Sequence, residues 1–358
     1  MNQWPSWLPL RQNLQELSAY GAPQLPADAV MNTNENPYPP SAALAKAIAD
    51  RISEVALTLN RYPDRDALVL RGKLADFING LSRTKFGSAN VWAANGSNEI
   101  IQSLFMAFGG GTALGFTPSY SMHPLIAKVT QVQWLNGNRR EDFTLDIDSA
   151  IEQIQRDKPT LTFITTPNNP TGSAVTIEEI EKIAKSTSGL LIVDEAYAEF
   201  SDEISAVTLI EKYPHVVVIR TMSKAFAFAG VRLGYLVADP AVVDAMFLVR
   251  LPYHLSALTQ AAGEVALDFK DELLGTVAQL RTDRDRVAAQ LSQMGLSVIP
   301  SASNFLLFSG FKMPSAQLWQ AMLDRGVLIR DVGLLGYLRV TIGNEAENTK
   351  FISTLSLC

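Results

Sequence analysis

Near the middle of the chain stands the segment Val216-Val217-Val218-Ile219-Arg220-Thr221-Met222-Ser223-Lys224. Its first four residues form an apolar run, which is typical of a buried strand. Lys224 follows among small and apolar neighbours that remove part of its hydration. Its neutral, nucleophilic amine therefore becomes accessible near neutral pH. Schiff-base chemistry with an aldehyde requires this form of the amine.

Two neighbours of Lys224 predict an anion nearby. The Ser223 hydroxyl can donate one hydrogen bond, and the Arg232 guanidinium can donate two in a fork, as a phosphate would need. The alternative is a surface lysine in a loop with an unrelated arginine. The rest of the chain decides between these two interpretations.

The composition limits the class of protein. The chain has 358 residues, of which 47% are hydrophobic, enough for a large core divided between two domains. A net charge of −6 without a run of Lys or Arg argues against nucleic acid as the main partner. The single cysteine excludes a disulfide framework, and three scattered histidines do not predict a zinc site. No apolar stretch reaches the roughly 18 residues of a membrane span, and the N-terminus lacks a signal-peptide pattern, so we expect a soluble, cytoplasmic protein.

Short apolar strands alternate with helices along the first two thirds of the chain. We expect strands over 91–94, 113–116, 161–164, 190–193 and 216–219. This alternation predicts an α/β fold with a large, mostly parallel, doubly wound sheet. Ligands of such sheets bind at the carboxyl ends of the strands. One crevice could therefore hold the polar residues that follow these strands, namely Asn169, Asp194, Tyr197, Ser223 and Lys224.

Two glycine-containing loops have different meanings. Asn95-Gly96-Ser97-Asn98 joins a strand to a helix, so its free backbone N–H groups predict an anion site. Taken alone, this signal is weak because serine is also an ordinary helix cap. Gly109-Gly110-Gly111 lies after a helix and before a strand, the reverse of a dinucleotide-binding loop, and indicates a helix end.

The pattern also divides the chain. Residues 1–30 are expected to form an N-terminal arm with a helix over 10–18, packing with the small domain. Residues 31–260 are expected to form the large domain. After long helical patterns over 256–269 and 271–294, short strands and a helix over 315–325 predict a small α+β domain over 261–358.

This set of residues resembles the fold-type I aminotransferases that use pyridoxal 5′-phosphate, and within them the histidinol-phosphate aminotransferase branch. The resemblance covers nearly the whole chain and implies a three-layer PLP-transferase fold. Its ordered motifs are Asn34-Glu35-Asn36-Pro37, Arg61-Tyr62-Pro63-Asp64, Pro118-Ser119-Tyr120-Ser121-Met122, Asn168-Asn169-Pro170-Thr171-Gly172, Asp194-Glu195-Ala196-Tyr197, Ser223-Lys224-Ala225-Phe226, Ser301-Ala302-Ser303-Asn304-Phe305 and Leu338-Arg339-Val340-Thr341-Ile342-Gly343.

The resemblance implies a role for each residue at the reacting atoms. Lys224 would bind the cofactor aldehyde and later move a proton between the substrate Cα and the cofactor. Asp194 would keep the pyridine nitrogen protonated, so that the ring can withdraw electrons. Asn169 and Tyr197 would donate to the O3′ oxygen of the ring. Tyr120 would stack on the ring face, and Ser97, Asn98, Ser223 and Arg232 would bind the cofactor phosphate.

The resemblance also implies partners and substrates. Tyr62 would reach the cofactor phosphate of a second subunit, which implies a homodimer with shared sites. Asn36, Arg330 and Arg339 would bind substrate, with Arg339 on the carboxylate of glutamate; for Arg330 a surface salt bridge is the alternative. The implied reaction is transamination between histidinol phosphate and 2-oxoglutarate in histidine synthesis.

Three other functions stay open at this point. The same fold serves aromatic amino acid aminotransferases and threonine-phosphate decarboxylases. Two departures from the branch pattern, Ala227-Phe228-Ala229 and a short loop between Arg330 and Arg339, leave the substrate undecided without touching the cofactor chemistry. A cofactor-binding regulator is disfavoured, because an arm of about 30 residues is too short for a DNA-binding domain.

Overall fold

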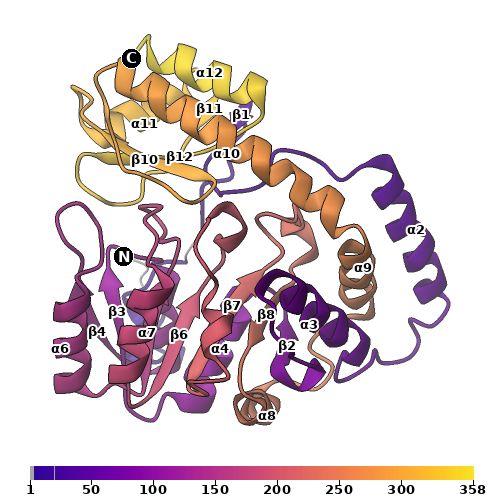
Figure 1. The fold of residues 1–358 in the computed structure, drawn as a ribbon. Helices are drawn as coiled ribbons and strands as arrows, with labels where there is room; N and C mark the ends of the chain where they lie inside the picture. Colours follow the sequence, from indigo (N-terminus) through magenta and orange to yellow (C-terminus); the bar gives the residue numbers. More distant parts are fainter. Residues whose placement is uncertain (1–3, 20) are drawn as a thin grey trace.

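The computed structural model describes residues 4–19 and 21–358. Its largest element is a sheet of seven strands in the order β2-β8-β7-β6-β5-β3-β4 (Figure 1). Within this sheet, β8 runs antiparallel to both of its neighbours and the other pairs are parallel. The predicted α/β class and mostly parallel sheet are confirmed. In this order the strands span Val91–Ala94, Gly234–Val237, Val216–Thr221, Leu190–Asp194, Leu161–Thr165, Thr112–Thr117 and Gln133–Asn138.

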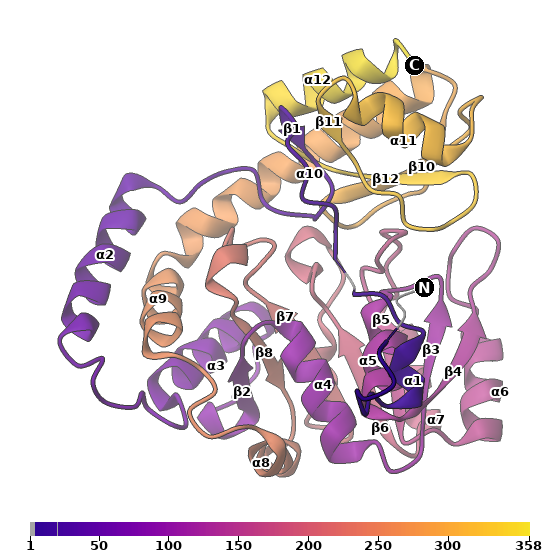
Figure 2. The same ribbon diagram turned by 180° about the vertical axis from the view of Figure 1, so that it is seen from behind.

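Helices cover both faces of this sheet (Figures 1 and 2). Successive side chains of a strand point to opposite faces, so Val216 and Val218 of β7 belong to one core, whereas Val217 and Ile219 belong to the other. The second core is closed by α4 (Ser97–Phe108), α5 (Met122–Thr130) and α8 (Pro240–Val249). The first is closed by α3 (Leu68–Ser82), α6 (Ile147–Asp157), α7 (Ile177–Ser186) and α9 (Ala257–Asp268).

A smaller α+β unit lies above the carboxyl ends of the parallel strands (Figure 1). Its antiparallel sheet has the order β12-β10-β9, and a two-stranded parallel sheet pairs β1 with β11. The long helix α10 (Lys270–Gln293) runs from α9 into this unit. The other bounds are Ala29–Val30 for β1, Ser297–Val298 for β9, Phe305–Ser309 for β10, Val327–Leu328 for β11, Tyr337–Thr341 for β12, Ser315–Leu323 for α11 and Glu345–Leu355 for α12.

The N-terminal arm contacts both units, whereas we expected it to pack with the small one. Its last residues do so, because β1 pairs with β11. The earlier helix α1 (Gln12–Gln15) lies against α5 instead (Figure 2). There the Arg11 guanidinium donates to the Val129 carbonyl at 2.9 Å, and the Asn13 amide donates to the Lys128 carbonyl at 2.7 Å. These bonds reach carbonyls in the last turn of α5, where the Lys128 carbonyl also accepts from the Gln131 N–H at 3.3 Å.

One helix is shorter than the sequence predicts. Helix α1 covers four residues rather than 10–18. Helix α2 covers Ala42–Ala56 in a stretch that no Gly or Pro interrupts. Ser41 caps it, since its hydroxyl accepts from the Leu44 N–H at 3.1 Å.

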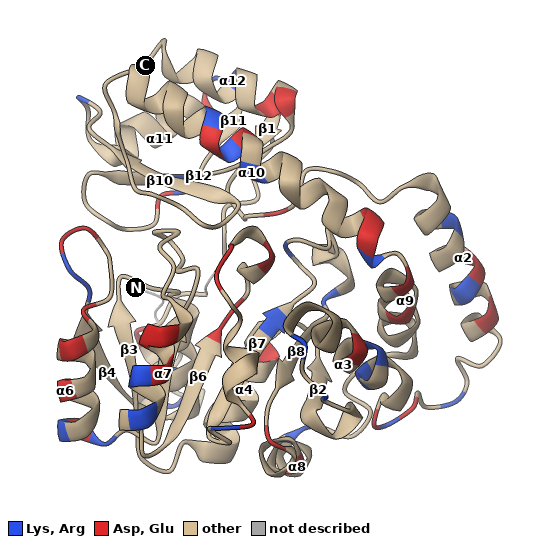
Figure 3. Cartoon of the chain, viewed as in Figure 1, with Lys and Arg blue, Asp and Glu red and all other residues tan. Residues whose placement is uncertain are grey.

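Charged side chains of both signs decorate the outer helices α2, α6 and α7 (Figure 3). Pairs on these surfaces, such as Lys46 with Asp50, are largely exposed. Exposed pairs of this kind contribute roughly 0–1 kcal/mol each.

Candidate active site

A cavity of about 420 Å³ opens between the carboxyl ends of the large sheet and the small unit. The residues that line it come from both units and from the segment after β1. Eleven of the predicted site residues are among them: Ser97, Asn98, Tyr120, Asn169, Asp194, Tyr197, Ser223, Lys224, Arg232, Arg330 and Arg339. The parallel topology explains this convergence for Tyr120, Asn169, Asp194, Tyr197, Ser223 and Lys224, which lie at or after the ends of strands β3, β5, β6 and β7, whereas Arg330 and Arg339 belong to the small unit above them.

Lys224 presents a half-buried amine to the cavity. Its Nζ donates to the Thr33 carbonyl at 2.8 Å. Burial lowers its pKa from 10.5 to about 8, and the guanidinium groups of Arg339 and Arg232 act in the same direction. The Glu35 carboxylate opposes them by favouring the charged amine. A substantial fraction of this amine is therefore neutral at mildly alkaline pH.

Asp194 ends β6 and is almost completely buried. One carboxylate oxygen contacts Nε2 of His123 at 3.1 Å, and the other accepts from the Ala196 N–H at 3.2 Å. The His123 ring itself lies 4.8 Å from the ring of Phe163, centroid to centroid. The two groups form a buried acid–imidazole pair at the floor of the cavity.

His123 is a residue that the sequence reading missed as a site residue. The sequence analysis treats it only as a possible zinc ligand. However, it directly follows the Tyr120-Ser121-Met122 segment of a motif that carries the family resemblance. Its contact with Asp194 spans 71 residues of chain. That position in the motif is the only signal in the sequence.

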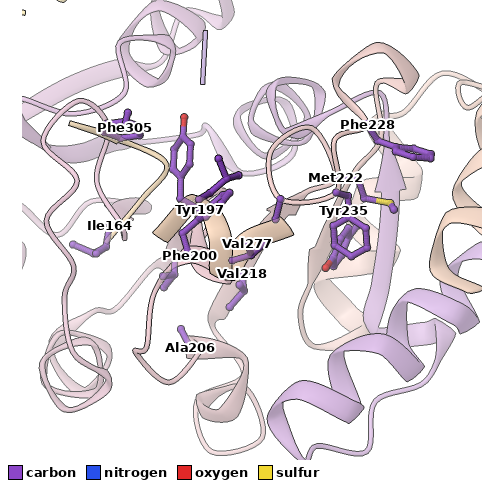
Figure 4. Packing of buried hydrophobic residues seen from close by; sticks show 14 of the residues in the cluster. Ile164, Tyr197, Phe200, Ala206, Val218, Met222, Phe228, Tyr235, Val277 and Phe305 are labelled. Atoms are coloured by element: carbon purple, nitrogen blue, oxygen red, sulfur yellow. The ribbon is translucent and has the colours of Figure 1, made fainter. Parts of the chain in front are cut away.

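Tyr197 directs its hydroxyl out of the core toward the small unit (Figure 4). Its ring packs edge-on against Phe305 with the centroids 5.1 Å apart. Its hydroxyl accepts from the Asn34 amide at 2.8 Å. Asn34 has a φ of 57° and is fixed by Thr341, whose hydroxyl donates to the Asn34 side-chain oxygen at 3.0 Å. Asn34 belongs to a motif that the sequence analysis quoted, but its role as the support for Tyr197 was not predicted.

Arg339 connects the small unit to the strand ends of the large sheet. Its Nη1 donates to the Asn169 side-chain oxygen at 2.6 Å, and its Nη2 donates to the Asn32 carbonyl at 2.8 Å. The bond from Nη1 orients the Asn169 amide so that its oxygen faces Arg339 and its NH₂ group remains available as a donor. Arg330 lies beside it, since the backbones of Arg330 and Arg339 exchange two hydrogen bonds of 2.9 Å.

The start of α4 lies in one corner of the cavity with Arg232 and Ser223. The Arg232 Nη1 donates to the Ser223 hydroxyl at 3.4 Å. Gly96 precedes the helix with a φ of 84°, and a Cβ there would lie 2.7 Å from Arg232 Nη2. A Cβ on Gly234 would lie 2.6 Å from the Ser97 nitrogen. These glycines let the helix start, β8 and the guanidinium come together, which concentrates N–H donors in one place. Tyr120 borders this corner, and its hydroxyl donates to the Asn98 side-chain oxygen at 3.2 Å.

Two predicted residues lie outside the cavity. The Asn36 amide donates to the Ala225 carbonyl at 3.1 Å and to the Thr276 hydroxyl at 3.0 Å. These bonds anchor the chain to α10 and to the loop after Lys224, and substrate binding by Asn36 stays a prediction. Tyr62 is 79% exposed and stacks on Tyr253 with the centroids 4.3 Å apart. Its role would require a second subunit, and it stays a prediction.

Over residues 4–19 and 21–358, no group of three or more His, Cys, Asp or Glu side chains is arranged to hold a metal ion. In the same part of the chain, no helix is long and apolar enough to cross a membrane.

The chain matches the family described as aminotransferase class I and II over residues 29–355. It belongs to this family. A histidinol-phosphate aminotransferase of Mycolicibacterium smegmatis is 55% identical over 350 residues, which are 97% of this chain and 92% of that protein. Another, from Corynebacterium glutamicum, is 56% identical over 348 residues, 96% of this chain and 95% of that protein. The branch that the sequence resembles is thus the one that these relatives carry in their names.

Solved structures agree on the fold. The histidinol-phosphate aminotransferase of Sinorhizobium meliloti in complex with pyridoxal-5′-phosphate superposes with a TM-score of 0.85 at 22% identity, covering 98% of each chain. An aspartate aminotransferase variant of Thermus thermophilus reaches 0.83 at 18% identity, covering 97% of this chain and 99% of that one. At these identities the likeness shows that the three-layer fold is shared.

Proposed function

We propose that the protein transfers an amino group between L-histidinol phosphate and 2-oxoglutarate, giving imidazole-acetol phosphate and glutamate, with pyridoxal 5′-phosphate as its cofactor. The observation that carries the proposal is the set of three guanidinium groups around one cavity that also exposes a lysine amine: Arg232 beside the start of α4, and Arg330 and Arg339 on the small unit. A guanidinium binds phosphate or carboxylate, and the proposed reaction brings both kinds of anion to the cavity: the cofactor phosphate, the phosphate of histidinol phosphate and the carboxylates of glutamate.

The residues present fit the cofactor. Ser97, Ser223 and Arg232 offer donors for its phosphate, and the crowded glycines beside them leave that corner open to an anion. Asp194 supplies a buried carboxylate for the pyridine nitrogen and has His123 behind it. Tyr197 and the NH₂ group of Asn169 can donate to the ring oxygen. When bound, the cofactor withdraws electrons from the substrate Cα.

The chain contributes proton transfer and orientation to this reaction. With its pKa lowered to about 8, Nζ of Lys224 can take up a proton from the substrate Cα and return it at the next step. Its bond to the Thr33 carbonyl gives the amine a defined position. The Asn34 amide and the Phe305 ring hold Tyr197 in a fixed orientation. Preorganised groups of this kind need little rearrangement during reaction.

We assign the carboxylate of glutamate and the phosphate of histidinol phosphate to the two arginines of the small unit. Arg339 would bind the carboxylate of glutamate, because it bonds to Asn169 and so lies next to the ring position. Arg330, on the adjoining backbone, would bind the phosphate of histidinol phosphate. A guanidinium fork suits either anion.

An assay of the purified protein tests this choice of substrate. Glutamate and imidazole-acetol phosphate should be converted efficiently to 2-oxoglutarate and histidinol phosphate. Good turnover of phenylpyruvate without turnover of imidazole-acetol phosphate would assign the protein to the aromatic aminotransferases. Release of CO₂ from threonine phosphate without a keto acid would make it a decarboxylase.

We further propose a homodimer with shared active sites. Tyr62 and Tyr253 stack on each other, and exposed apolar side chains lie near them in the chain, after α2, at the start of α3, at the end of α8 and in α9. We propose that these side chains form one apolar patch, which a monomer rarely leaves in water. A second copy covering this patch would bring Tyr62 toward a neighbouring cavity. The patch consists of Leu57, Leu59, Tyr62, Leu68, Val69, Leu248, Leu251, Tyr253 and Leu258.

Since the proposed substrates are intermediates of amino-acid synthesis, we also propose that the protein works in the cytoplasm, which cell fractionation would test.

A further inference from the structure

A buried cluster of charges lies on the reverse face of the large sheet, behind the cavity. Arg220 Nη2 contacts Glu195 Oε2 at 2.8 Å, and Arg220 Nη1 contacts Glu199 Oε1 at 3.0 Å. All three side chains are at most 5% exposed. None of them lines the cavity, so the functions assigned so far leave this cluster unexplained.

Strand alternation explains why the cluster and the cavity are on opposite faces. In β6 and β7, Asp194 pairs with Ile219. Asp194 and Thr221 face the cavity. Glu195 follows Asp194 and Arg220 precedes Thr221, so these two neighbouring side chains point to the other face of the sheet. The Glu195 N–H donates to the Ile219 carbonyl at 2.9 Å, which joins the two strand ends directly in front of the cluster.

The residues of the cluster are close in sequence to Asp194, Tyr197 and Lys224. Glu195 follows Asp194 directly, and Glu199 comes two residues after Tyr197 in the short helix Ala198–Phe200. Arg220 therefore holds the segment that carries Asp194 and Tyr197 at two points, one on each side of Tyr197. Arg220 itself lies four residues before Lys224 in the next strand.

The chemistry of the cluster suits a rigid support. Glu195 is also bonded by the Ser205 hydroxyl at 2.7 Å and by the Ala206 N–H at 2.7 Å. Burial raises the pKa of Glu199, opposed by Arg220. Burying three charged groups costs several kcal/mol per ion before pairing, and apolar residues of similar volume would often serve stability as well or better. Stability alone is thus a weak reason for a guanidinium at this place.

We propose that Arg220 is a positioning residue, which through Glu195 and Glu199 sets the Asp194 carboxylate and the Tyr197 hydroxyl in their working positions. The guanidinium fork is essential to this role, because its two Nη atoms reach two carboxylates in different directions. A lysine keeps the charge but cannot make both contacts in the same geometry. The inference rests on the proposed function, since the positions that it concerns are those of the cofactor's ring contacts.

The test compares Arg220→Lys with Arg71→Lys. Arg71 is equally buried and donates to the carbonyls of Asp66, Ser88 and Val91, away from the cavity. Both variants should unfold at lower temperature than the parent. Only Arg220→Lys should weaken the binding of pyridoxal phosphate to the cofactor-free protein. The loss should be roughly tenfold, which corresponds to the loss of about one good hydrogen bond. Only this variant of the two should also shift the midpoint pH at which the visible absorption of the bound cofactor changes.

Glu199→Gln provides a second variant, because it keeps the size of the side chain and its hydrogen bond to Arg220 while removing one charge. It should fold like the parent and shift the same midpoint by a smaller amount. If Arg220→Lys and Glu199→Gln lower only the unfolding temperature, as Arg71→Lys does, the cluster is purely structural and the inference is wrong. If the parent protein itself fails to bind pyridoxal phosphate, the proposed function is overturned, and this inference with it.

Discussion

At Lys224, burial and two guanidinium groups act together to disfavour the charged amine. The Arg339 and Arg232 groups that lower its pKa are the ones expected to bind substrate and cofactor anions. The same arrangement therefore attracts the anions and prepares the nucleophile. Glu35 is the group that opposes it.

The reaction of the cofactor-free protein with pyridoxal phosphate should follow the neutral fraction of this amine. We expect its rate to rise with pH through a midpoint near 8, since the pKa of Lys224 is lowered from 10.5 to about 8. Glu35→Gln removes a charge that raises this pKa and should move the midpoint to lower pH. Stopped-flow absorbance over a pH series measures both. A midpoint above 10, or a shift in the opposite direction for Glu35→Gln, would contradict this account of the amine.

Arg330 and Arg339 are assigned to different substrates, so a substitution of Arg330 should affect KM for only one of them. Arg330→Ala removes the group assigned to the phosphate, so it should raise KM for histidinol phosphate about 30-fold, the effect of losing a charged hydrogen-bond donor. KM for glutamate, which has no phosphate, should change little, and it serves as the internal control. Each half-reaction can be followed separately by single-turnover absorbance. Equal losses for both substrates would show that Arg330 does not read the phosphate.

At the scale of elements, the site depends on how closely the start of α4 approaches β8. Gly234 allows this approach, because a Cβ there would lie 2.6 Å from backbone atoms of Gly96 and Ser97, and Gly96 leaves room for the Arg232 guanidinium, which a Cβ would meet at 2.7 Å. The helix start can then direct its N–H groups at the phosphate.

Gly234→Ala should therefore weaken pyridoxal phosphate binding and lower stability, because its Cβ would lie 2.6 Å from backbone atoms of Gly96 and Ser97. Gly80→Ala is the matched control. Gly80 lies in the exposed part of α3 with no atom within 4 Å of a new Cβ, and the change should stabilise the helix by about 0.5–1 kcal/mol. Fluorescence titration and urea unfolding give the two quantities. Unchanged cofactor affinity in Gly234→Ala would show that this close approach is not needed for the site.

At the scale of the whole molecule, two units meet over the cavity, and the proposed dimer interface consists of exposed apolar side chains. Leu248 at the end of α8 is 86% exposed. The outer helices α2, α6 and α7 carry charges of both signs (Figure 3), whereas the side chains of the proposed interface are apolar.

Leu248→Asp should convert the proposed dimer to a monomer and reduce activity, because Tyr62 would no longer reach a second site. Leu357→Asp is the control, since Leu357 is 73% exposed near the C-terminus, outside the patch. Light scattering coupled to size-exclusion chromatography measures the mass of each. A monomeric parent, or a variant that remains dimeric, would rule out this patch as the interface.

The α/β class and five of the cavity residues could be predicted from local patterns, because Asn169, Asp194, Tyr197, Ser223 and Lys224 each follow an apolar strand, and parallel strands bring their carboxyl ends to one edge. The expectations for Tyr120, Arg330 and Arg339 come from the family resemblance. The support behind these residues could not be predicted in the same way. The contacts of His123 with Asp194, Asn34 with Tyr197 and Arg220 with Glu199 join parts of the chain 71, 163 and 21 residues apart. Only the register of the strands and the path of the segment after β1 bring these partners together, and the contact of α1 with α5, which the sequence did not predict, likewise joins distant parts of the chain.

The central claim is that Lys224 is the amine that binds the cofactor. Reduction of the cofactor-loaded protein with borohydride, followed by peptide mass spectrometry, tests it most directly. We expect the phosphopyridoxyl group on the peptide that contains Lys224 and on no other lysine. Its attachment to a different lysine, or its absence from every peptide, would contradict the account.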